Sequence, residues 1–109
     1  MINKISPLHK ILPLDNSSYF EILGKSEAHA LRSGFVTLPP GADVGVHSTE
    51  NYEELIIVLN GRGELEVNGQ KMTKIKKGQI AYNPPQTKHN VYNTGKAPLR
   101  YIYVIAKAI

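Results

Sequence analysis

The chain has 109 residues, and 13 Lys and Arg residues against nine Asp and Glu residues give it a formal net charge of +4. This length fits one domain with one hydrophobic core and is too short for two. The absence of cysteine excludes disulfides, zinc ribbons, iron–sulfur clusters and a thiol nucleophile. The basic residues are mostly dispersed and accompany no nucleic-acid motif, so we expect no nucleic-acid partner.

The first part of the chain carries no motif. We interpret residues 1–32 as a segment that packs on the rest of the domain or exchanges between two subunits. Its opening stretch is interrupted by Pro7 and Pro13 and lacks the continuous apolar run of a leader. The longest apolar run, residues 55–59, is far shorter than the roughly 20 residues of a spanning helix. We therefore expect a soluble, cytoplasmic protein with no membrane partner.

Short apolar runs separated by turn residues follow this segment. Gly, Pro and Asn end most of the runs, and Asn68-Gly69 is typical of a two-residue hairpin turn. The predicted strands are residues 33–38, 44–49, 55–59, 64–67, 70–75, 79–82, 89–93 and 99–106. Residues 27–32 could be helical but fit a strand equally well. Short strands at this spacing predict an all-β sandwich or barrel.

One predicted strand suggests a partner. Residues 55–59 are apolar at every position, so both faces of the strand should be covered. One face would meet the barrel interior, and the other needs a second sheet or a second subunit. The pattern therefore predicts a homodimer.

Three residues in the predicted strands could bind a metal. His47 ends one strand, Glu54 precedes the apolar strand and His89 begins another. If the strands pair as neighbours, these side chains could converge. Two imidazoles and one carboxylate form a ligand set for transition metals. Spacing alone also fits a buried, hydrogen-bonded histidine or one on the surface.

The order of these residues resembles the two motifs of the cupin family. The first motif, G-x5-H-x-H-x3,4-E-x6-G, aligns with Gly41, His47, Thr49, Glu54 and Gly61. The second motif, G-x5-P-x-G-x2-H-x3-N, aligns with Gly78, Pro84, Gln86, His89 and Asn93. The resemblance covers roughly residues 33 to 105. It implies a small single-domain β-barrel of the cupin 2 type, a double-stranded β-helix or jelly roll, over residues 33–109.

The resemblance also implies a metal site. The family typically holds one divalent metal with three His and one Glu, so His47, Glu54 and His89 carry over as ligands for Fe, Mn, Ni, Zn or Cu. Thr49 replaces the second histidine, and a threonine hydroxyl is a poor ligand for these metals. Gln86 replaces a glycine and would bring a long polar side chain near the site, where Tyr52 is a further candidate. A cavity without metal is the alternative.

The function that the resemblance implies is metal-dependent chemistry on a small organic molecule. The enzyme would be an oxidoreductase of the dioxygenase type, an isomerase or epimerase, or a decarboxylase. The alternatives are a non-catalytic cupin that binds or senses a small molecule, and a barrel that only supports a dimer. The sequence names neither the substrate, nor the metal, nor a catalytic residue.

Overall fold

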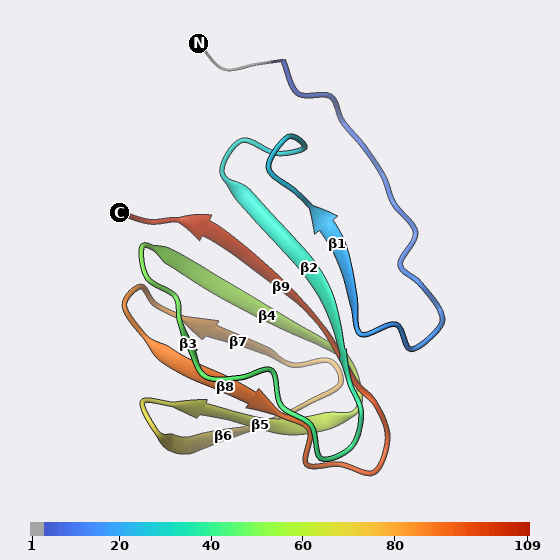
Figure 1. The fold of residues 1–109 in the computed structure, drawn as a ribbon, viewed down its shortest axis with the longest axis vertical. Coiled ribbons are helices and arrows are strands. Elements are labelled where there is room, and N and C mark those ends of the chain that lie inside the picture. The colour runs from blue at the N-terminus through green and yellow to red at the C-terminus, as the bar shows by residue number, and fades with distance from the viewer. Residues whose placement is uncertain (1–3) are drawn as a thin grey trace.

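A computed structural model describes residues 4–109, whose strands form two antiparallel sheets that face each other (Figure 1). The strands are β1 Tyr19–Leu23, β2 Leu31–Leu38, β3 His47–Ser48, β4 Tyr52–Asn60, β5 Arg62–Val67, β6 Gln70–Lys76, β7 Ile80–Asn83, β8 Lys88–Tyr92 and β9 Leu99–Lys107. One sheet has the order β1-β2-β9-β4-β7 and the other β3-β8-β5-β6. None of the described residues belongs to a helix long and apolar enough to span a membrane. The all-β prediction is confirmed.

The main departures from the predicted strands lie before β4. The predicted strand over residues 44–49 shrinks to the two residues of β3. Gly45 interrupts it because its φ of 97° is not an extended conformation, and its N–H donates to Asp43 Oδ1 at 2.9 Å instead of joining a ladder. Residues 27–30 form turns and bends, so the helical reading of that stretch is wrong. β1 was not predicted.

The turns that the sequence predicted have the expected backbone. Asn68 and Gly69 have φ values of 52° and 84°, as a type I′ hairpin turn requires. Gly61 has φ 81° and lies against the next connection, because a Cβ built on it would be 2.4 Å from the carbonyl oxygen of Pro98. These turns set the register of β4, β5 and β6.

Part of the N-terminal segment contacts the five-stranded sheet, whereas residues 4–11 are exposed and residues 1–3 fall outside the described range. β1 pairs with β2 and forms an edge of that sheet. Further upstream, Arg100 Nη2 donates to the carbonyl oxygens of Pro13 at 2.6 Å and Asp15 at 3.1 Å. The guanidinium of Arg100 also stacks over the ring of Phe35 at 4.9 Å. These contacts join the region of Pro13 and Asp15 to the sheet, and exchange of the segment between subunits stays a prediction.

The hydrophobic core fills the space between the two sheets. Its buried members come from β2, β4, β5, β6, β8 and β9: Val36, Leu38, Ile56, Val58, Leu65, Ile75, Val91, Leu99 and Tyr101. Along β4 the buried side chains alternate with half-buried ones, so Glu54 points inward on the same face as Ile56 and Val58. This alternation places a carboxylate inside the barrel.

Candidate metal centre and its cavity

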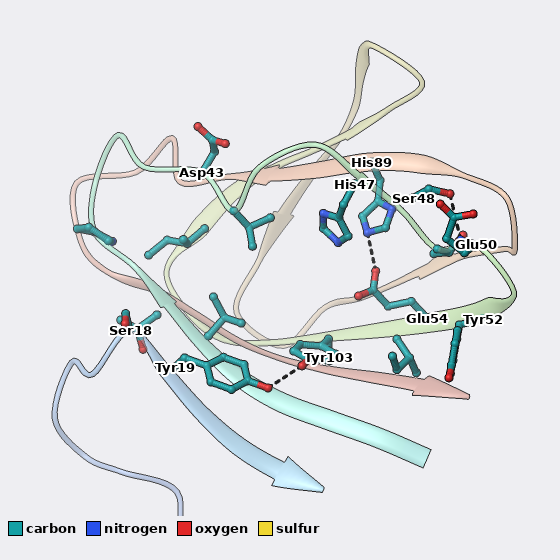
Figure 2. Close-up of a pocket in the computed structure, with 17 residues that line it drawn as sticks. Ser18, Tyr19, Asp43, His47, Ser48, Glu50, Tyr52, Glu54, His89 and Tyr103 are labelled. Atoms are coloured by element: carbon teal, nitrogen blue, oxygen red, sulfur yellow. Dashed lines mark hydrogen bonds and ion pairs between the residues drawn. The ribbon is translucent and has the colours of Figure 1, made fainter. Parts of the chain in front are cut away.

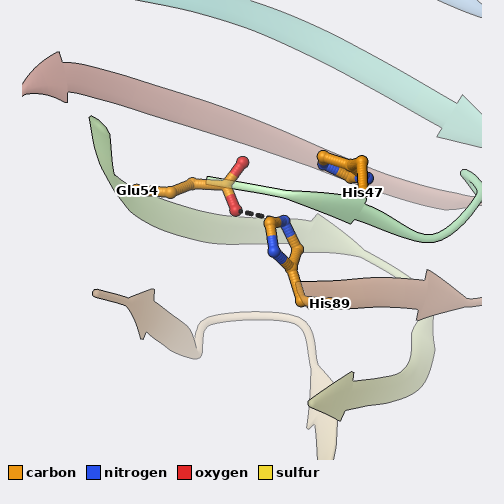
Figure 3. A group of neighbouring side chains, drawn as sticks. All are labelled: His47, Glu54 and His89. Carbon is orange, nitrogen blue, oxygen red and sulfur yellow. Dashed lines mark ion pairs between the residues drawn. The ribbon is translucent and has the colours of Figure 1, made fainter. Parts of the chain in front are cut away.

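The three predicted ligands lie together, at the point where the two sheets face each other (Figure 3). His47 in β3 and His89 in β8 are direct cross-strand partners. Their rings lie 4.2 Å apart between centroids. Glu54 reaches them from β4 in the facing sheet, and one candidate ligand atom from each residue lies within 4.8 Å of the others. Their role as metal ligands stays a prediction.

Backbone carbonyls orient both imidazoles. His47 Nδ1–H donates to the carbonyl oxygen of Gly45 at 2.8 Å, and His89 Nδ1–H donates to that of Thr87 at 3.1 Å. A carbonyl oxygen only accepts, so Nδ1 carries a proton and Nε2 is the nitrogen that faces the cluster. Metal-binding histidines are commonly oriented in this way. In His89 that Nε2 is buried.

The buried Nε2 of His89 faces a carboxylate. It lies 3.0 Å from Glu54 Oε1, and the same oxygen accepts a hydrogen bond from Asn83 Nδ2 at 3.0 Å. Burial raises the pKa of Glu54, but its contacts with His89 and Asn83 outweigh burial and lower it. Burial lowers the pKa of His89, but Glu54 and the Thr87 carbonyl outweigh burial and raise it. The carboxylate of Glu54 and the imidazole of His89 therefore favour a positive charge between them, which either a proton or a metal cation can supply.

The donor set fits a divalent transition metal. His47, Glu54 and His89 offer two imidazole nitrogens and a carboxylate, a combination that suits such metals and leaves coordination positions open. The lone pair of His89 Nε2 and the charge of Glu54 would both be satisfied by such an ion.

The hydroxyl of Thr49 makes two hydrogen bonds to the connection between β7 and β8. It donates to the carbonyl oxygen of Pro84 at 2.6 Å and accepts from Thr87 N–H at 3.0 Å. Thr49 therefore ties the connection before β4 to the connection before β8. Because Thr87 also holds the His89 ring, this link supports a candidate ligand indirectly.

The other two near-site candidates lie in different places. Tyr52 lines the cavity beside the cluster. Gln86 is not among the described lining residues, and its amide donates instead to Asn51 Oδ1 at 3.2 Å. Gln86 has φ 57°, a left-handed conformation that favours glycine. The backbone at this position therefore suits the glycine of the family motif, although the residue here is glutamine.

A cavity of about 730 Å³ opens beside the cluster (Figure 2). Asp43, Glu50 and Glu54 are the ionisable acids in its wall, and no Lys or Arg lines it among the residues that the structure describes. Most of the exposed lining is apolar. The cavity is therefore a largely apolar space whose polar residues include three acids and two histidines.

Sequence reasoning assigned no site role to two tyrosines that line this cavity. Tyr19 comes from the unpredicted β1 and Tyr103 from β9, and their hydroxyl oxygens lie 2.7 Å apart. The available signal was the alternation in residues 19–22, where Tyr19 and Glu21 share one face and Phe20 and Ile22 the other.

Comparison with known proteins places this site in a family. The model of the Cupin domain matches residues 34–105. An oxalate-binding protein of Thermotoga maritima is 37% identical over 68 residues, which are 62% of this chain and 55% of that protein. An uncharacterized protein of Methanocaldococcus jannaschii is 34% identical over 65 residues, 60% of this chain and 51% of its own length. The chain thus spans about half the length of these curated relatives.

Solved structures have the same fold. The crystal structure of a predicted oxalate decarboxylase from Thermotoga maritima has a TM-score of 0.66 at 32% identity, covering 70% of this chain and 65% of that one. A cupin protein from Bacteroides fragilis reaches a TM-score of 0.77 at 22% identity, covering 91% and 84%. With the family model over most of its length and this two-sheet architecture, the chain belongs to the cupin family.

Proposed function

We propose that this cupin domain binds a divalent transition metal through His47, Glu54 and His89 and holds a small organic carboxylate against it. When bound, the metal would supply positive charge and Lewis acidity toward a ligand oxygen. The protein would orient the two imidazoles through Gly45 and Thr87 and would surround the ligand with the cavity wall. The name of the Thermotoga maritima oxalate-binding relative supports a carboxylate as the ligand.

The charge of the cavity wall carries this proposal. The described lining includes three acidic residues and no Lys or Arg. An ionised carboxylate that leaves water without a partner loses a large solvation energy, and the acidic wall would repel it further. A divalent cation bound at His47, Glu54 and His89 would reverse this balance. Binding of an organic anion should therefore depend on the metal.

Oxalate tests this dependence directly. We expect protein loaded with Zn²⁺ or Mn²⁺ to bind oxalate at least about 100-fold more tightly than metal-free protein, a difference of about 2.7 kcal/mol. Isothermal titration calorimetry on the two forms measures it, with a His29→Ala variant as the control because His29 lies outside the cavity. Equal oxalate affinity with and without metal would contradict the proposal.

Turnover of the ligand and the cytoplasmic location stay predictions. An activity of the dioxygenase, isomerase or decarboxylase type would use the same metal and cavity. The printed name of the structural neighbour, a predicted oxalate decarboxylase, supports testing oxalate for release of carbon dioxide and formate first.

We also propose that the outer face of the five-stranded sheet pairs with a second copy of the chain. This face is apolar, half-buried or exposed, and is formed by Leu55, Ile57, Ile80, Tyr82, Ile102 and Val104. Charged groups lie toward its margins, at Glu53, which accepts a hydrogen bond from Tyr82, and at Arg100 beside Asp15. Two chains of charge +4 repel each other. A face with an uncharged centre adds no local charge repulsion, so it is the face on which we expect two copies to pack.

The mass in solution tests this pairing. We expect the wild type to sediment as a dimer of the 12.1 kDa chain, and Ile57→Lys to sediment as a monomer because it buries a charge in the interface. Thr73→Lys adds the same charge at an exposed position of β6 and should leave the dimer intact. A monomeric wild type, or a dimeric Ile57→Lys variant, would contradict the proposal. Sedimentation velocity at several concentrations distinguishes these outcomes.

A further inference from the structure

We infer that the paired hydroxyls of Tyr19 and Tyr103 bind the end of the ligand that points away from the metal. The preferred ligand is then longer than oxalate: a carboxylate with an apolar body and an oxygen acceptor at its far end. The inference rests on the proposed function for the carboxylate end of the ligand, and on the tyrosine pair for the other end.

Tyr19 and Tyr103 form a stacked, hydrogen-bonded pair in the cavity wall. Their hydroxyl oxygens lie 2.7 Å apart and their rings stack at 6.4 Å between centroids. Gly34 in β2 makes room for them, because a Cβ there would lie 2.5 Å from the Tyr19 hydroxyl and 2.6 Å from the Tyr103 ring. Figure 2 shows both hydroxyls inside the cavity, on the side opposite His47 and His89.

The pair has one hydrogen-bond donor to spare. Two hydroxyls carry two protons, and the contact between Tyr19 and Tyr103 uses one of them. Neither oxygen makes another hydrogen bond in the part of the chain that the structure describes. Burial and the Tyr19 hydroxyl raise the pKa of Tyr103, so Tyr103 remains a neutral donor. The second proton is available to a ligand oxygen.

The space between the metal site and the tyrosine pair suits an apolar body. Val36, Leu38 and Ile105 are among the residues that line the cavity, which measures about 730 Å³. Cavities of about 300–1,000 Å³ hold drug-sized ligands. A two-carbon dianion such as oxalate would leave most of this apolar wall without contact. A longer ligand would cover it and bring a second oxygen to the tyrosines.

A matched pair of probes tests the inference. Phenylpyruvate and 4-hydroxyphenylpyruvate share a 2-oxo carboxylate for the metal and differ only in an oxygen at the far end. We expect Zn²⁺-loaded wild type to bind 4-hydroxyphenylpyruvate about 5- to 10-fold more tightly, the value of one net hydrogen bond. The double variant Tyr19→Phe/Tyr103→Phe should bring this ratio to about one. Calorimetric titration of both probes gives the ratio.

The control is Tyr92→Phe, which removes a hydroxyl bonded to Glu66 outside the cavity and should keep the wild-type ratio. A ratio near one in the wild type, or an unchanged ratio in the double variant, would overturn the inference. Oxalate is titrated alongside to separate the two proposals. If oxalate binds equally with and without metal while the probe ratio follows the tyrosines, the proposed function fails and the tyrosine inference stands.

Discussion

Replacing His89 by alanine is expected to reduce metal affinity by at least about 100-fold, because a direct ligand contributes more than the outer contacts whose loss costs about 10- to 100-fold. The variant leaves Glu54 in a buried position without its ion-pair partner. Glu54→Gln should have an effect of similar size, since it removes the negative charge while its amide oxygen can still accept from Asn83. Titration of metal-free protein with Zn²⁺, Ni²⁺ and Mn²⁺ measures both losses.

Two further variants make this experiment decisive. His47 is exposed, so His47→Ala tests the ligand set without disturbing the core and should also weaken metal binding. His9→Ala makes the same chemical change in the exposed N-terminal segment and should bind metal like the wild type. Elemental analysis of untagged protein purified without added metal gives an independent check. If His47→Ala and His89→Ala both retain wild-type affinity, the ligand assignment is wrong.

The convergence of His47, Glu54 and His89 could be predicted because it follows from local patterns. The gapped motifs place one histidine in each of two strands, and β3 and β8 pair so that these histidines are opposite each other. Alternation along β4 then turns Glu54 inward with the core residues. Each step depends on strand period and turn position, which a single sequence carries.

Other features of the cavity depend on contacts between distant segments, which strand patterns do not encode. Tyr19 and Tyr103 are separated by 84 positions and meet only because β1 and β9 flank β2. Val44 and Val46 look like strand residues, but the left-handed backbone at Gly45 takes them out of β3. The partners of Thr49 lie in a loop more than 30 positions away, so its identity alone could not reveal them.

Thr49→Val is expected to lower both stability and metal affinity. Valine has nearly the same shape but no hydroxyl, so the carbonyl of Pro84 and the N–H of Thr87 both lose a buried partner. Each unsatisfied group costs about 1–3 kcal/mol, and we expect the free energy of unfolding to fall by about 2–4 kcal/mol. Metal affinity should fall by about 10-fold because Thr87 then holds the His89 ring less firmly.

Two other substitutions at Thr49 distinguish a hydrogen-bonding role of its hydroxyl from a role as metal ligand. Thr49→Ser keeps the hydroxyl and should stay close to the wild type in both denaturant unfolding and metal titration. Thr49→His restores the family's second histidine but removes the link to Pro84 and Thr87. If Thr49 were only a lost ligand, Thr49→Val would be neutral and Thr49→His would tighten metal binding without a loss of stability. We expect instead that Thr49→Val and Thr49→His both lower the free energy of unfolding and that Thr49→Ser stays closest to the wild type. The reason is that the hydroxyl holds together the two loops that frame the site.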